Sequence, residues 1–205
     1  MSSMLFGALA LAAALPPLAL SRRWTVMVGS LGLMFIGLSL AEAALAGPVV
    51  GVARFIVGLS VMGALIAPRT AFPGSLTSAA LSPVQPESED HSRSSGDAFD
   101  EVFRFFLMVL AIVAAFALSQ VAPVLGSSVD SSIASFFAYW MGILGLFLVV
   151  YSQRLLRLGV GLMILLSAAN LLYADLGNPG VATLLAGAVP YLCIALAVTR
   201  GELTA

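Results

Sequence analysis

Two charged side chains, Glu42 and Arg54, lie inside otherwise apolar stretches of this 205-residue chain. A charged group at the centre of a lipid bilayer costs about 3 kcal/mol or more, so such residues mark candidate functional positions. Glu42 precedes and Arg54 follows a Gly47-Pro48 turn, which places both side chains roughly 6–10 Å from the same end of two antiparallel helices. Two interpretations stay open here: the groups pair with each other, or each snorkels separately towards the lipid headgroups.

Three uncharged residues are further candidates. Ser167 and Asn170 share one face of a later apolar stretch, and such side chains can hydrogen-bond between helices. Pro190 lies inside the last apolar stretch, where it frees a backbone carbonyl and predicts a helix kink.

Several kinds of chemistry are excluded by residue counts. His91 is the only histidine, Cys193 the only cysteine, and all nine basic residues are arginine. An internal disulfide, a thiolate zinc site, a bis-histidine haem and a lysine nucleophile are therefore impossible within this chain. A net charge of −1 offers no basic stripe for nucleic acid. We expect no cofactor and no metal, and an enzyme is the least favoured class.

The elements that position these residues follow from composition. The chain is 60% apolar and only 9% charged, whereas soluble domains carry roughly 25% charged residues. Mean hydropathy is +1.07, which indicates an integral membrane protein. Backbone groups in lipid must be satisfied internally, so long apolar runs predict helices. We expect an all-α, polytopic membrane protein with seven transmembrane helices, near 4–20, 24–46, 49–66, 101–122, 133–152, 155–173 and 181–198.

Arginine placement predicts the orientation. With seven spans, eight of the nine arginines fall on one side of the membrane, so the positive-inside rule puts the N-terminus outside and the C-terminus in the cytoplasm. We expect a three-helix part at 1–66, a polar cytoplasmic loop at 67–100, and a four-helix part at 101–205. Composition predicts that 82–96 is a disordered linker.

Small residues recur within the predicted helices. Ser39, Ala43 and Gly47 are spaced by four, Gly142 and Gly145 mark a later helix, and Gly159 and Gly161 open the next. Such residues let membrane helices approach closely. Two interpretations stay open: these stripes pack the seven helices together, or some of them face other membrane subunits.

The run Tyr139–Tyr173 combines a glycine-punctuated helix, a turn with arginines, and a helix that reads Gly161-Leu162 to Asn170-Leu171-Leu172. This run resembles the first two helices of the small K subunit of bacterial respiratory complex I, and the C subunit of multisubunit sodium/proton antiporters. The E subunit of hydrogenase-4-type complexes is similar over more of the chain, including a turn like Ser21-Arg22-Arg23. The resemblance is strongest over 136–205.

The departures from that pattern concern titratable residues. In the complex I subunit a glutamate follows the Gly-Leu of the second helix, but Met163 stands at that position here. A second family glutamate would fall near Val189-Pro190 and is also absent. The resemblance therefore implies a place in the membrane arm of a complex I-like assembly, in a bacterial inner membrane, without a proton-carrying carboxylate in this chain.

We expect an accessory subunit of a multisubunit ion-translocating complex, bound to larger antiporter-like membrane subunits and to lipid, with any redox subunits on other chains. The alternative is a subunit of a non-redox antiporter-like transporter for cation/proton exchange or inorganic carbon uptake. A self-sufficient small transporter is the third possibility, but it needs a polar site near the midplane, and only Pro190 hints at one.

Overall fold

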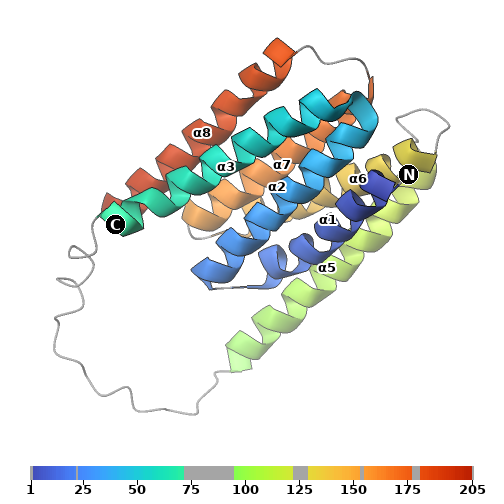
Figure 1. The fold of residues 1–205 in the computed structure, drawn as a ribbon. Coiled ribbons are helices and arrows are strands. Elements are labelled where there is room, and N and C mark those ends of the chain that lie inside the picture. Colours follow the sequence, from blue (N-terminus) through green and yellow to red (C-terminus); the bar gives the residue numbers. More distant parts are fainter. Residues whose placement is uncertain are drawn as a thin grey trace.

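The structure is a computed structural model, and it describes residues 2–21, 23–71, 95–121, 129–152, 155–176 and 181–204. These residues form seven helices that run side by side in one bundle (Figure 1). The helices are α1 (Ser2–Leu20), α2 (Trp24–Ala46), α3 (Pro48–Ala71), α5 (Ser95–Val121), α6 (Val129–Val150), α7 (Leu155–Leu176) and α8 (Val181–Thr204).

Every predicted apolar run coincides with a helix, and most helices extend beyond the run. The run at 24–46 is reproduced by α2, whereas α3 continues to Ala71 and α5 begins at Ser95. The extra turns of α5 are polar, and a helix can continue past the apolar run that marks the bilayer core. Residues 72–94, which include most of the predicted polar loop and the linker at 82–96, lie outside the described residues.

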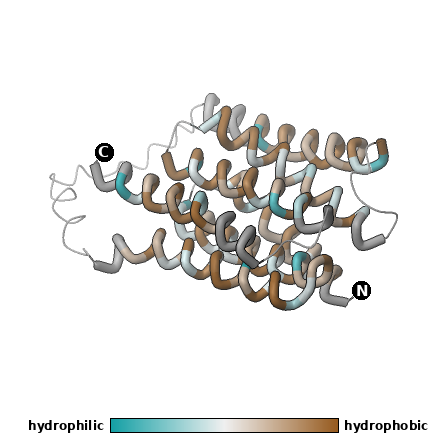
Figure 2. The backbone as a smooth tube through the Cα atoms, turned by 90° about the horizontal axis from the view of Figure 1, so that it is seen from above, coloured by the Kyte–Doolittle hydropathy of each residue, from teal (hydrophilic) through white to brown (hydrophobic). Residues whose placement is uncertain are grey.

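Five of the described helices are long and apolar enough to cross a membrane: α2, α3, α5, α6 and α7. Two shorter apolar helices, Met4–Leu20 and Ala188–Arg200, are found in α1 and α8. Apolar residues dominate along the bundle, with few hydrophilic positions between them (Figure 2). The chain is therefore a multi-pass, all-helical membrane protein over the part that the structure describes.

Helices that follow one another within α1–α3 and within α5–α8 pack as antiparallel neighbours, whereas α3 and α5 do not contact each other over the described residues. The last helix, α8, contacts both α3 and α7. The bundle has two layers, because α2 also contacts α7 and α1 contacts α6. The turn between α2 and α3 depends on Gly47, whose φ of 101° is a left-handed conformation that suits glycine. Pro48 then opens α3, at a position where its missing N–H has no helical partner to lose.

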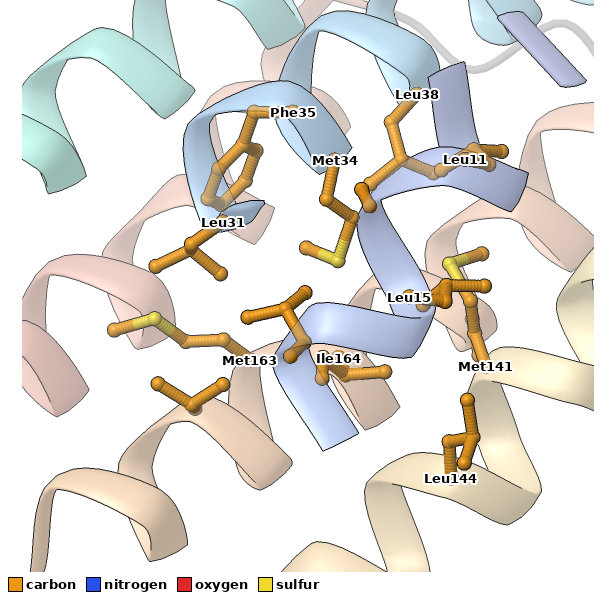
Figure 3. Close-up of a cluster of buried hydrophobic side chains, with 14 of the residues drawn as sticks. Leu11, Leu15, Leu31, Met34, Phe35, Leu38, Met141, Leu144, Met163 and Ile164 are labelled. Carbon is orange, nitrogen blue, oxygen red and sulfur yellow. The ribbon is translucent and has the colours of Figure 1, made fainter. Parts of the chain in front are cut away.

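The core is an apolar cluster between the layers. Leu11 and Leu15 of α1 meet side chains from α2, α6 and α7 there (Figure 3). Met163 and Ile164 of α7 point into the same cluster from the opposite layer, and both are buried.

Several of the small residues lie where two helices of this chain pack closely against each other. A Cβ on Gly51 would lie 2.5 Å from the Cβ of Ala43 and 2.6 Å from the carbonyl oxygen of Ser39. A Cβ on Gly145 would lie 2.9 Å from the carbonyl oxygen of Gly161. These contacts hold α2 against α3, and α6 against α7, at distances that larger residues do not permit.

Candidate functional site

Glu42 and Arg54 form a buried ion pair between α2 and α3. Arg54 Nε lies 3.2 Å from Glu42 Oε1, and the exposed fractions of the two residues are 4% and 0%. The structure thus places the two side chains against each other, and separate snorkelling towards the headgroups is wrong. The short Gly47-Pro48 turn brings the helices together at this level, as the sequence predicts.

The pair continues into a polar cluster centred on the phenol of Tyr191 in α8. Arg54 Nη2 donates a hydrogen bond to the Tyr191 hydroxyl at 3.0 Å, and Asn170 Nδ2 of α7 donates to the same oxygen at 3.2 Å. Ser167 Oγ of α7 lies 2.9 Å from it. Three helices, α3, α7 and α8, therefore meet at one hydroxyl group, and Arg54 links α2 to it through Glu42. We call these five side chains the Tyr191 cluster: Glu42, Arg54, Ser167, Asn170 and Tyr191.

The donors and acceptors of the Tyr191 cluster determine the direction of each hydrogen bond. Ser167 donates its hydroxyl proton to the Met163 carbonyl oxygen at 2.8 Å. A phenol has one proton and two lone pairs, and Arg54 and Asn170 occupy the two lone pairs. The Tyr191 hydroxyl must then donate to Ser167 Oγ, and every hydrogen-bonding position of the phenol is filled.

The carboxylate of Glu42 is less well satisfied. The described residues contain four buried side-chain nitrogen and oxygen atoms without a hydrogen-bond partner, and three are Glu42 Oε1, Glu42 Oε2 and Arg54 Nε. Arg54 Nε and Glu42 Oε1 are close enough for an ion pair, but the N–H is not directed at the oxygen. The attraction between them is Coulombic, without an aligned hydrogen bond.

The Tyr191 cluster lies in one half of the bundle. By helix rise, Glu42 is about 6 Å from the end of α2, Arg54 and Asn170 are about 9 Å from the matching ends of α3 and α7, and Tyr191 is about 15 Å from the start of α8. All four distances are measured from the end of the bundle that carries Gly47. The polar side chains therefore reach from near one end to about the middle.

Aromatic side chains pack beside the Tyr191 cluster. The ring of Phe35 in α2 meets the Tyr191 ring edge-on, with centroids 5.7 Å apart and an interplanar angle of 68°. Gly58 of α3 makes room for this ring, because a Cβ there would lie 2.6 Å from the Phe35 Cβ. The Arg54 guanidinium carbon is 4.9 Å from the Tyr191 ring centroid, so the cation also contacts the ring face.

The other two candidates occupy different environments. Met163 is buried, at 1% exposure, and joins the Tyr191 cluster only through its backbone carbonyl. Pro190 lies within α8, which continues through it to Thr204, and its side chain is exposed. The kink predicted at Pro190 stays a prediction.

Tyr191 is the residue that the sequence reasoning missed. It directly follows Pro190 in an apolar helix, and a buried tyrosine needs a hydrogen-bond partner for its hydroxyl. This need for a partner is the signal that could have identified Tyr191. Polar side chains that can meet the need are present on other helices, at Arg54, Ser167 and Asn170. Which helices face α8 is a tertiary fact, and the sequence does not give it.

The contacts of the Tyr191 cluster connect α2, α3, α7 and α8 to one another. Within the described ranges no group of three or more His, Cys, Asp or Glu side chains is placed to hold a metal ion. Glu42 and Arg54 are the buried charged residues of the described chain, and they neutralise each other. Comparison with protein families, with curated proteins and with solved structures finds no match to this chain.

Proposed function

We propose that this chain is an accessory membrane subunit of a multisubunit ion-translocating complex, complex I-like or membrane-bound hydrogenase-like in kind. In this proposal it positions larger antiporter-like subunits and has no proton-carrying carboxylate of its own. The observation that carries the proposal is the pairing of Glu42 with Arg54, because a carrier needs a charge that can be gained and lost. Within the described residues the buried charges are instead committed to each other and to Tyr191.

Met163 supports the same proposal. The resemblance to the complex I subunit places a glutamate at this position, and a thioether cannot take up a proton. The Met163 side chain is buried and packs with the apolar core (Figure 3). The position thus serves packing, in line with a passive role for the helix that carries it.

The outer surface of α5 supports binding to a larger partner or to lipid. This helix turns the small residues Ala111, Ala115 and Ser119 inward, where they are buried. Phe105 and Phe116 on its other side are 55% and 59% exposed. Apolar area on this scale needs either lipid chains or another membrane protein against it.

We further propose that the N-terminus is outside, that the C-terminus is cytoplasmic, and that the membrane is a bacterial inner membrane. Arg157 Nη2 donates to the Ser21 carbonyl oxygen at 3.3 Å, so the α1–α2 and α6–α7 connections meet at one end of the bundle. Arg23 is exposed at that end. Arginines gathered at one end support a cytoplasmic assignment for it.

The test is to purify the tagged chain in mild detergent and to identify the co-purifying proteins by mass spectrometry. The proposal expects stoichiometric antiporter-like subunits. Iron–sulfur or hydrogenase-like subunits among them favour a redox-driven complex, and antiporter-like subunits without them favour the non-redox transporter. Recovery of the chain alone, under conditions that keep other membrane complexes intact, contradicts both.

A further inference from the structure

Two arginines from distant parts of the chain are brought together at one end of the bundle. Arg157, in the first turn of α7, donates from Nη2 to the carbonyl oxygen of Ser21 at 3.3 Å. The Ser21 hydroxyl oxygen accepts from the backbone N–H of Arg23 at 3.1 Å. The half-buried guanidinium of Arg157 therefore lies beside the stretch of backbone from which the exposed side chain of Arg23 projects.

This pair of arginines lies at the level where two apolar spans begin. The membrane-spanning part of α2 starts at Trp24, directly after Arg23. That of α7 starts at Leu155, within one helix turn of Arg157. Tyr151 is 58% exposed at the same end of the bundle, and tryptophan and tyrosine gather where the hydrocarbon meets the lipid headgroups. The two guanidinium groups are therefore at the depth of the phospholipid phosphates.

The sequence places no acidic residue close to this pair. The acidic residue nearest to Arg23 along the chain is Glu42, at the opposite end of α2, and the one nearest to Arg157 is Asp175, at the opposite end of α7. The first turns of α2 and α7 contain no acidic residue. The N-terminal ends of both helices carry a partial positive charge, which adds to the charge of the two guanidinium groups. This end of the bundle is therefore suited to an anion.

We propose that Arg23 and Arg157 bind the phosphate of one anionic phospholipid. Arginine presents its N–H donors in a planar fork that matches the oxygens of a phosphate group. Two positive charges favour a lipid with a net negative charge over a zwitterionic lipid, because the ammonium group of the latter cancels the charge of its phosphate. Val26 is 38% and Leu155 is 53% exposed, and these side chains give the acyl chains an apolar surface that a free phosphate ion could not use.

The lipid site goes beyond the proposed function, because it depends on the membrane and on no other subunit. Arg23 belongs to the connection between α1 and α2, and Arg157 belongs to α7, in the opposite layer of the bundle. A phosphate held by both arginines therefore joins the two layers at this end. A ligand that binds only the folded chain stabilises it, so we expect the bound lipid to raise the Tm.

The experiment is native mass spectrometry of the full chain, released from detergent micelles that contain equal amounts of phosphatidylglycerol and phosphatidylcholine with the same acyl chains. We expect the parent chain to retain one phosphatidylglycerol in preference to phosphatidylcholine. Each arginine at a membrane surface contributes a factor of about five to the binding of an anionic lipid. The preference should then fall about fivefold in Arg23→Gln and about thirtyfold in the double variant Arg23→Gln/Arg157→Gln.

The matched control is the double variant Arg104→Gln/Arg200→Gln, which removes the same charge from the same end of the bundle. Arg104 follows Asp100 by one helix turn. Arg200 is closely followed by Glu202. Because each of these arginines has an acidic neighbour, we expect the control to keep the preference for phosphatidylglycerol. Equal losses in the two double variants would mean a diffuse attraction to the whole surface and would overturn the site, as would a parent chain without any preference.

A second arm separates a lipid headgroup from a free anion. Inorganic phosphate at millimolar concentration is added to the micelles before the chain is released. We expect phosphatidylglycerol to stay bound, because phosphate alone lacks the acyl chains that contact the apolar surface. Replacement of the lipid by a bound phosphate ion would identify a free-anion site and would contradict the lipid proposal.

A third arm separates loss of binding from loss of folding. Arg23 is exposed, so Arg23→Gln and the parent chain should have the same Tm in micelles that contain phosphatidylcholine alone. Addition of phosphatidylglycerol should then raise the Tm of the parent chain more than that of Arg23→Gln. Equal rises in the two chains would show that Arg23 does not bind the lipid, which contradicts the site.

Discussion

The guanidinium of Arg54 donates a hydrogen bond to the hydroxyl of Tyr191, which lies 137 residues further along the chain. This contact joins the N-terminal helices to α8, and through Ser167 and Asn170 it extends to α7. The two parts of the sequence on either side of the 67–100 segment thus share one buried polar cluster. In a bundle that is otherwise held by apolar packing, such a cluster fixes how the helices are placed relative to one another.

Removing one member of the Glu42–Arg54 pair should destabilise the chain strongly. Each of Glu42→Ala and Arg54→Ala leaves the other charge buried, at a cost of up to about 3–5 kcal/mol. The double change removes both charges, so we expect its effect on the free energy of unfolding to be smaller than the sum. Unfolding in mixed micelles measures all three variants, with Arg23→Ala as an exposed control. Additive effects would show that the two charges do not interact.

Tyr191→Phe tests the centre of the Tyr191 cluster. The phenylalanine keeps the ring that packs against Phe35 but leaves Arg54 Nη2 and Asn170 Nδ2 without their acceptor. We expect a loss of about 1–3 kcal/mol in the free energy of unfolding, which is the cost of unsatisfied buried groups. Tyr173→Phe, at a side chain that is 51% exposed, should have little effect. Equal losses in the two variants would mean that the cluster does not stabilise the bundle.

Gly145→Ala tests the close approach of α6 and α7. The new Cβ would lie 2.8 Å from the backbone nitrogen of Leu165 and 2.9 Å from the Gly161 carbonyl oxygen, and neither atom can move without moving its helix. We expect destabilisation of about 1–3 kcal/mol. Gly29→Ala is the matched control, because a Cβ there meets nothing within 4 Å. A neutral Gly145→Ala variant would show that the helices pack less closely than described.

Met163 tests the proposed passive role at the position where the resemblance to the complex I subunit would place a glutamate. Met163→Leu conserves volume and polarity, so we expect a change below about 1.5 kcal/mol in stability and nearly unchanged ion transport by the assembled complex. Met163→Glu places a carboxylate in the apolar core and should impair assembly. A large loss of transport in Met163→Leu, with normal assembly, would contradict a passive role for this residue.

The helices could be predicted from the sequence because the bilayer leaves so few alternatives for long apolar runs. The Glu42–Arg54 contact could also be predicted from the sequence, because the short Gly47-Pro48 turn makes their helices neighbours. Ser167 and Asn170 were identified by their polarity alone. Tyr191 was not, because it lies in an apolar helix and its charged partner, Arg54, is 137 residues away in the sequence. In a membrane protein both the interior and the lipid face are apolar, so hydrophobic patterning indicates weakly which side of α8 faces α3.

The proposed function is tested most directly by ion flux into lipid vesicles that contain this chain alone, compared with vesicles that contain the complete complex at the same subunit density. We predict that the complex supports flux, that Met163→Leu within it retains that flux, and that the isolated chain gives no more than empty vesicles. Flux by the isolated chain that disappears in Glu42→Gln would contradict the accessory role, because it would make Glu42 an ion carrier.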